Sequence, residues 1–127
     1  MKRAAGTLLI CELTNRILLV KRSDTVGSFE NTWATVGGGI DHLEKPLDAA
    51  KRELWEETKI ESDNIDFVFF EKQNLSNTDY YFFIGWVDEE VGCDLNDENT
   101  DWGWFDIDNL PDPLIPTLYT SLQRIFT

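Results

Sequence analysis

Three glutamates lie close together in the segment KRELWEETKI, at positions 53, 56 and 57. On an α-helix, residues three and four positions apart share a face, so Glu53 would lie beside both Glu56 and Glu57, and each like-charge pair would cost about a few tenths of a kcal/mol. Neither Glu53 nor Glu57 has a basic residue three or four positions away that would offset this repulsion. A charged stripe is often only a solvated helix face, but the missing basic partners favour a site for a cation.

The residue types in the chain indicate which cation this site would take. Carboxylate oxygens are hard ligands, which suit Mg²⁺ or Mn²⁺ better than zinc. The single histidine, His42, reads as a loop residue, and together with the isolated Cys11 and Cys93 it does not make a typical structural zinc site. An EF-hand is excluded, because the acidic segment from Asp94 lacks the glycine at its sixth position and the glutamate at its twelfth. The expected cofactor is Mg²⁺, with Mn²⁺ as a substitute.

The acidic segment and the glycines before it together resemble the Nudix box, G-x5-E-x7-R-E-U-x-E-E-x-G-U, in which U is an aliphatic residue. Lys59 stands where this pattern has a glycine, at a helix end that often needs a left-handed backbone. Leu43 likewise replaces a glycine that commonly precedes the first glutamate of the box. The other specified positions are all filled, by Gly38, Glu44, Arg52, Glu53, Leu54, Glu56, Glu57 and Ile60.

The resemblance to the Nudix family implies an enzyme that hydrolyses a phosphoanhydride bond in a nucleoside diphosphate linked to another group. We expect the substrate to be a (deoxy)nucleoside triphosphate or a related small nucleotide. A nucleotide sugar, ADP-ribose or a dinucleoside polyphosphate is the alternative, and a catalytically silent nucleotide-binding module is a third hypothesis. The clustered glutamates favour the enzyme, since a silent module has no need of acids that repel one another. Bound metal would also let a highly negative protein approach an anionic substrate.

The resemblance implies residue roles position by position. Glu53, Glu56 and Glu57 are the expected metal ligands, and the backbone carbonyl of Gly38 is expected to be a further one. The glycine run Gly37–Gly39 is expected to form a turn that brings the backbone against metal and phosphate, because glycine permits close approach.

Other positions are expected to support these ligands or to move a proton. Arg52 is expected to act in catalysis by orienting a glutamate through a charge-assisted hydrogen bond, and Glu44 is expected to brace the loop. Glu98, in the segment NDENTDWGWF, resembles a downstream glutamate of many family members, and we expect it to be the general base or an additional ligand. Glu53 is the alternative base, followed by Asp101 or Glu44.

Basic residues are also present near the end of the second predicted strand. Lys21 and Arg22 could meet a phosphate there, but basic residues at strand ends are usually solvated, and we favour that interpretation for both.

The alternation of apolar residues predicts the scaffold that must hold these groups. Its order, three strands, a helix, three strands and a helix, predicts an α/β fold: a Nudix-like α/β/α sandwich with a mixed β-sheet between helices. The segment YYFFIGWV is apolar on both faces and is expected inside the sheet. Strands are predicted at 4–11, 17–21, 33–36, 65–71, 80–87 and 101–107. Helices are predicted from about Pro46 to a break near Lys59–Asn64 and at about 114–126.

The length of 127 residues predicts one domain, 1–127, and the formal net charge of −13 limits its partners. Such a surface repels nucleic-acid backbones and anionic membranes, so we expect a small nucleotide and neither nucleic acid nor membrane as the partner. The apolar start of the chain is predicted to be a strand rather than a signal peptide, and two isolated cysteines are typical of a cytoplasmic protein. The sequence does not predict an oligomeric state.

Overall fold

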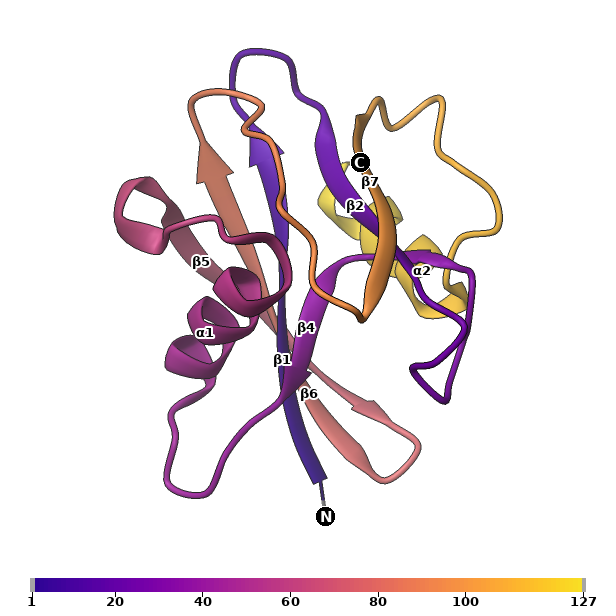
Figure 1. Cartoon of the computed structure of the whole chain (residues 1–127). Coiled ribbons are helices and arrows are strands. Elements are labelled where there is room, and N and C mark those ends of the chain that lie inside the picture. Colours follow the sequence, from indigo (N-terminus) through magenta and orange to yellow (C-terminus); the bar gives the residue numbers. More distant parts are fainter. Residues whose placement is uncertain (1, 127) are drawn as a thin grey trace.

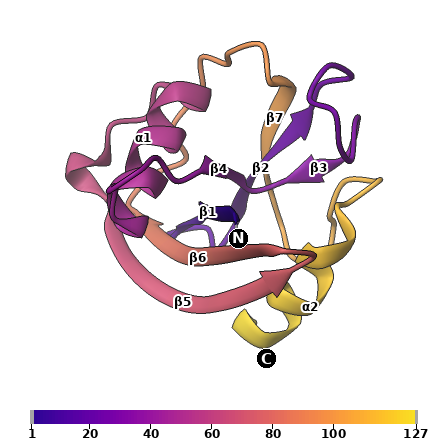
Figure 2. The same ribbon diagram turned by 90° about the horizontal axis from the view of Figure 1, so that it is seen from below.

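The computed structural model describes residues 2–126, and they form a twisted mixed sheet with a helix on each side (Figures 1 and 2). Figure 2 shows the helices α1 and α2 on opposite sides of the strands. A short 3₁₀ turn, Ser62–Asn64, follows α1. The strands are β1 (Lys2–Cys11), β2 (Ile17–Arg22), β3 (Trp33–Ala34), β4 (Val36–Gly39), β5 (Asp66–Leu75), β6 (Thr78–Val87) and β7 (Asn99–Phe105), and the helices are α1 (Pro46–Thr58) and α2 (Pro116–Ile125).

Strand β6 lies inside the sheet, as its apolar sequence predicts. It runs parallel to β1 on one side and antiparallel to β5 on the other, in the order β3-β2-β1-β6-β5. Strand β4 pairs with β1 and β7 pairs with β2, both antiparallel. The sheet is therefore mixed and has a helix over each face, which confirms the predicted α/β/α sandwich.

Alternating residues of β1 point to opposite faces of the sheet and supply two separate cores. Leu8 and Ile10 pack in the core beneath α2, together with Leu118 and Leu122 of that helix. Leu9 and Cys11 pack on the other face, in the core that includes Leu54 of α1. The side chains of α1 are thereby fixed on one face of the sheet, and those of α2 on the other.

The prediction for the glycine run was wrong. The expected strand at 33–36 is interrupted at Thr35, and the glycines lie in β4, paired with Ala4–Thr7 of β1. They form a strand rather than a turn because they continue the pairing of β4 with β1, in which Gly37 lies too close to β1 for a side chain. A Cβ on Gly37 would lie 2.7 Å from the carbonyl oxygen of Ala5 and 2.8 Å from the Cα of Gly6.

Other predicted boundaries also moved, among them the starts of β1 and β6, which lie two residues earlier than expected. Strand β5 continues to Leu75 and joins β6 through the two-residue turn Ser76-Asn77, where both residues have positive φ. Strand β7 begins two residues earlier than expected, at Asn99, and ends at Phe105. Helix α2 begins at Pro116, because Leu114 instead forms a bridge with Trp33. Within residues 2–126, neither helix has the length and apolar character that a membrane-crossing helix needs.

Candidate active site

Arg52, on α1, contacts four acidic side chains and one backbone carbonyl. Its Nε and Nη2 each donate at 2.9 Å to the carboxylate of Glu44, and Nη2 also donates to the carbonyl oxygen of Gly39 at 2.9 Å. Its Nη1 donates to Glu53 at 3.0 Å and to Glu56 at 3.1 Å. Asp41 lies at 3.7 Å, as an ion pair. The guanidinium thus ties the loop before α1 to the acidic face of the helix, as expected of an orienting arginine.

Glu44 braces the loop, as predicted. Besides the two bonds from Arg52, its Oε1 accepts a hydrogen bond from the backbone N–H of Asp41 at 2.9 Å. Hydrogen bonding to Arg52, and then to the Asp41 backbone, lowers the pKa of Glu44 to about 2. This carboxylate, near the end of the loop before α1, therefore stays ionised over the whole neutral range.

Glu57 is buried, and neutral donors hold both of its oxygens. Oε1 accepts a hydrogen bond from Nδ2 of Asn99 at 2.9 Å, and Oε2 accepts one from the backbone N–H of Gly37 at 3.1 Å. Burial, together with the smaller effect of the nearby Glu98 charge, raises the pKa of Glu57 to about 8 against the opposing hydrogen bond from Asn99. Ionised Glu57 therefore lacks a positive partner among residues 2–126.

Glu53 is also buried, and its carboxylate lies directly against β4. A Cβ on Gly38 would be only 2.5 Å from the carboxyl carbon of Glu53. Burial raises the pKa of Glu53, and the hydrogen bond and charge of Arg52 oppose this effect. The sequence had indicated no basic partner three or four positions away, but the partner is the adjacent residue, so Glu53 is not unpaired.

Glu53, Glu57 and Glu98 form the acidic cluster of this protein. One carboxylate oxygen from each lies within 4.8 Å of those of the other two. Two of the three carboxylates are buried and destabilised in their ionised form by that burial, so a divalent cation would relieve both the desolvation and the mutual repulsion. Three hard oxygen donors in this arrangement fit Mg²⁺ or Mn²⁺.

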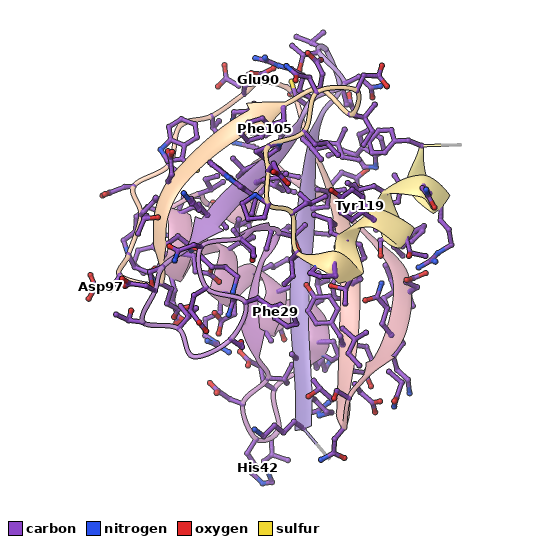
Figure 3. The ribbon with its side chains drawn as sticks, turned by 90° about the vertical axis from the view of Figure 1, so that its right-hand side faces the viewer. Phe29, His42, Glu90, Asp97, Phe105 and Tyr119 are labelled. Atoms are coloured by element: carbon purple, nitrogen blue, oxygen red, sulfur yellow. The ribbon has the colours of Figure 1, made fainter. Side chains whose placement is uncertain are left out.

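The predicted ligands are not all in this cluster. Glu56 lies outside it, and its side chain is 44% exposed and bonded to Arg52, so its role as a ligand stays a prediction. The same holds for the Gly38 carbonyl, whose residue is in place beside Glu53. His42 lies at the far end of the loop before α1, away from the cluster (Figure 3). The Asp101 carboxylate accepts a hydrogen bond from the backbone of Trp102.

Glu98 reaches the cluster because its acidic loop docks on the end of α1. The backbone N–H of Asp94 donates to the carbonyl oxygen of Thr58 at 2.9 Å, and the N–H of Ser23 donates to that of Glu98 at 2.8 Å. Figure 3 shows Asp97, the neighbour of Glu98, at the surface. Asn99 then holds Glu57, 42 residues away in the sequence. Sequence reasoning missed Asn99, since an asparagine in an acidic loop carries no signal of such a contact.

Both positions where the box usually has glycine adopt the left-handed backbone that glycine favours. Leu43 has a φ of 68° and Lys59, which caps the C-terminus of α1, a φ of 62°. A side chain in this conformation costs about 1–2 kcal/mol. The Nζ of Lys59 lies 4.0 Å from the ring centroid of Trp55, a cation–π contact that offsets part of the cost. Leu43 and Lys59 are therefore strained, but their backbone keeps the left-handed conformation that glycine favours.

A cavity of about 600 Å³ lies on the other side of β4 from the acidic cluster. It is bounded by β4, the hairpin of β5 and β6, the loop before β3 and the start of α2. Among the residues that line it, Arg22 is the only charged one. Its guanidinium donates to the carbonyl and hydroxyl oxygens of Ser28, and the neighbouring Phe29, 52% exposed, stands at the cavity (Figure 3). Arg22 is therefore not merely solvated.

The cluster and the cavity meet at two glycines. Gly37 and Gly38 line the cavity, while the N–H of Gly37 donates to Glu57 and a Cβ on Gly38 would lie 2.5 Å from the Glu53 carboxylate. Only backbone lies between the two regions at this point. The cluster and the cavity therefore border the same two residues of β4.

The family model for the NUDIX domain matches residues 1–125. The chain belongs to the NUDIX family. The family assignment made from the box is thereby confirmed.

Known proteins similar to this NUDIX chain include both curated relatives and solved structures. An RNA pyrophosphohydrolase of Cereibacter sphaeroides is 45% identical over 56 residues, which make up 44% of this chain and 35% of that protein. The match thus spans about a third of the relative's length. A MutT NUDIX hydrolase from Burkholderia pseudomallei superposes with a TM-score of 0.76, at 22% identity over 98% of this chain and 97% of that one. A C. elegans Ap4A hydrolase gives a TM-score of 0.80, at 21% identity over 97% and 94%. At these identities, the two structures show the fold.

Proposed function

We propose that this NUDIX protein is a Mg²⁺-dependent pyrophosphohydrolase that cleaves a phosphoanhydride bond in a nucleoside diphosphate linked to another group. The observation that carries this proposal is the junction at Gly37 and Gly38, where a nearly uncharged cavity with one arginine meets a cluster of three carboxylates. The cavity volume is within the range of small-ligand sites. The linked phosphates of one nucleotide could therefore span both regions.

The acidic cluster is the proposed metal site. Glu53, Glu57 and Glu98 would hold the ion, with Glu56 and the Gly38 carbonyl as the further ligands that the family resemblance implies. When bound, a divalent ion neutralises phosphate oxygens and takes up the charge that develops as the anhydride bond breaks. Mn²⁺ has the same preference for oxygen ligands and would substitute.

The remaining residues of the site would position the metal-binding carboxylates and activate the attacking water. Arg52 holds Glu53 and Glu44 in place, while Asn99 and Gly37 fix both oxygens of Glu57. The Glu98 side chain is exposed and has no hydrogen bond to any residue between 2 and 126. Glu98 would therefore act either as a ligand of the ion or as the general base. As the base, it would accept the proton of the attacking water while the water oxygen bonds to phosphorus and the bridging P–O bond of the anhydride breaks, with the departing phosphate group taking the electron pair. Glu53 is the alternative base.

The proposed substrate is a (deoxy)nucleoside triphosphate or a related small nucleotide. Arg22 would meet a phosphate in the cavity, and Phe29 would offer its ring to a base there. Nucleotide sugars, ADP-ribose and dinucleoside polyphosphates remain alternatives of the same chemistry. The relative named RNA pyrophosphohydrolase favours a second candidate substrate, a pyrophosphate bond at an RNA end. The net charge of −13 opposes extended electrostatic contact with an RNA backbone.

The experiment is a substrate panel with chromatographic identification of products. Wild type and Glu57→Gln are incubated with Mg²⁺ and nucleoside triphosphates, nucleotide sugars, ADP-ribose, dinucleoside polyphosphates or a 5′-triphosphorylated oligoribonucleotide. We expect turnover of at least one small nucleotide and a loss of about 10²- to 10³-fold in Glu57→Gln, the scale of removing one electrostatic stabiliser.

The matched control is Glu61→Gln, which makes the same change at an exposed residue just beyond α1 and should keep full activity. Mg²⁺ should also raise the melting temperature of wild type and of Glu61→Gln more than that of Glu57→Gln. A wild-type protein that is inert on the whole panel and shows no shift with millimolar Mg²⁺ would contradict the proposal. Turnover of the oligoribonucleotide alone would favour the second candidate.

A further inference from the structure

Gln73, on β5, has a side-chain amide whose orientation is fixed by neighbours outside the cavity that it lines. Gln73 and Ser121 of α2 both line the cavity, whereas Glu71 and Arg124 do not. The Nε2 of Gln73 donates to the Oγ of Ser121 at 2.8 Å and to a carboxylate oxygen of Glu71. These contacts join the sheet and α2 at one wall of the cavity.

Charge decides which end of the amide faces Glu71. Arg124 donates to both oxygens of the Glu71 carboxylate, through Nε at 3.1 Å and through Nη2. Burial raises the pKa of Glu71, but the hydrogen bond from Gln73 and the interaction with Arg124 outweigh burial, so the pKa is lowered. An ionised carboxylate only accepts hydrogen bonds. Gln73 must therefore turn its NH₂ group, and not its oxygen, toward Glu71.

The amide oxygen of Gln73 remains available as an acceptor. Both hydrogens of its NH₂ group are engaged, by Glu71 and by Ser121. Its Oε1 accepts no hydrogen bond within residues 2–126, and it is not sealed in the interior, because Thr7 Oγ1 is the one buried side-chain N or O atom without a partner in that range. Gln73, a residue of this wall, therefore carries an unpaired neutral acceptor, and its amide orientation is set by Glu71.

We propose that Gln73 is a specificity-determining residue whose Oε1 accepts a hydrogen bond from an N–H group of the substrate's base. The proposal rests on the proposed function only in taking a nucleotide as the ligand. Glu71 and Arg124 act through Gln73 as positioning residues, because they prevent the amide from rotating to offer a donor. A base that presents an amino group at this point gains a hydrogen bond, whereas one that lacks it leaves Oε1 desolvated and unpaired.

Pairs of nucleoside monophosphates that differ by one amino group test this directly, since their binding needs no turnover. Calorimetry with the full chain and Mg²⁺ compares AMP with purine riboside monophosphate, GMP with IMP, and CMP with its 4-deamino analogue. For wild type, we expect the amino-bearing member of at least one pair to bind about tenfold more tightly, the scale of one hydrogen bond. That ratio should fall to about one in Gln73→Met.

A second variant separates the fixed orientation from the mere presence of Gln73. In Glu71→Gln the neighbour can donate as well as accept, so the Gln73 amide can rotate and the ratio should fall without loss of Gln73. Gln123→Met makes the same change as Gln73→Met on the exposed face of α2 and should leave the ratio unchanged. Each ratio comes from one protein sample, so a general loss of stability does not alter it.

The outcomes also distinguish this inference from the proposed function. No binding, equal binding within every pair by wild type, or a ratio that Gln73→Met leaves intact would overturn the role of Gln73, whatever the substrate panel shows. An inert enzyme whose binding ratio still depends on Gln73 and Glu71 would refute the proposed hydrolysis and support the acceptor. Hydrolysis by wild type, together with a binding ratio that does not depend on Gln73, would support the proposed function and refute the acceptor.

Discussion

The acidic cluster takes two of its three carboxylates from one turn of α1, whereas the cavity behind β4 is lined from six separate parts of the chain. Glu53 and Glu57 are four residues apart, and helical geometry alone brings them together. Gln73 and Ser121 are 48 residues apart and meet only because α2 packs on the sheet. The part of the site proposed to do the chemistry is thus mostly local in sequence, with Glu98 as the exception, whereas the part proposed to choose the substrate depends on the tertiary fold throughout.

The three consecutive glycines of β4 provide the test with the largest expected effects, because an alanine at each should change activity and stability in a different way. Gly38→Ala would displace the Glu53 carboxylate, a movable group, so we expect a folded protein with turnover reduced about 10²-fold. Gly37→Ala would meet the backbone of β1 and should destabilise the fold by about 1–3 kcal/mol. A Cβ on Gly39 meets nothing within 4 Å, so Gly39→Ala is the control.

Melting temperature and Mg²⁺-dependent turnover of the three variants, measured side by side, check this prediction. Full activity in Gly38→Ala would refute the claim that a side chain at position 38 disturbs the acidic cluster. That claim would be weakened if all three variants lost stability and activity in proportion.

Arg22→Ala tests the cavity side with a smaller effect. The loss of a charged donor to phosphate should raise KM about tenfold or more, while the Mg²⁺-dependent shift in melting temperature stays as in wild type. The preceding residue, Lys21, does not line the cavity, so Lys21→Ala is the matched control. Steady-state kinetics and thermal melts measure the two effects separately. A lost metal shift in Arg22→Ala would mean that the two regions are not independent.

Two strained residues flank α1, Leu43 in the loop before the helix and Lys59 at its C-terminus. We expect substitutions at these residues to change stability and not activity. Leu43→Gly should raise the free energy of unfolding by about 1 kcal/mol, because it removes the side chain from a residue whose backbone is left-handed. Little packing is lost, since Leu43 is 86% exposed. Lys59→Gly should gain less, since it also loses the contact with Trp55. Leu13→Gly, at an equally exposed leucine without positive φ, should not stabilise. Urea unfolding ranks the variants, and a destabilised Leu43→Gly would contradict the strain.

The smallest effect concerns the pH dependence of the bond between Glu44 and Arg52. Folding lowers the pKa of Glu44 from 4.5 to about 2, so its stabilisation is present above pH 4.5 and is lost as the pH falls toward 2. Glu44→Gln should thus be less stable than wild type at pH 6, and the difference should narrow by pH 3. Urea unfolding with EDTA measures this, with Glu12→Gln as an exposed control. A difference that widened toward acid would contradict the assignment.

Local features of the site could be predicted from the sequence because they depend on helical spacing. The approximate extent of α1, the adjacency of Glu53 and Glu57, and a hydrogen bond from Arg52 to a glutamate were all predicted from a pattern within 23 residues, without naming Glu53 or Glu44 as the partners of Arg52. Glu98 was also expected near the site, on a looser resemblance. The family and the sandwich fold followed from the same segment and from the strand pattern.

The rest depended on partners that the spacing does not reveal. The glycine run was predicted to be a turn because nothing in it indicates that β1 lies 2.7 Å from a Cβ at Gly37. Asn99 and Gln73 are ordinary polar residues until distant elements place Glu57 and Ser121 beside them. Arg22 was expected to be solvated, since its sequence neighbours do not show the cavity that it lines.

The cavity with its single arginine has a consequence for the rate of substrate capture. A chain of net charge −13 repels a free nucleotide over the Debye length, which is about 10 Å at 0.1 M salt, and Arg22 attracts it only at close range. Added salt would weaken the long-range repulsion more than the short-range attraction, so the association rate would rise with ionic strength, the reverse of an electrostatically steered enzyme. A nucleotide that arrives already complexed with Mg²⁺ would meet a lower barrier than the same nucleotide without it.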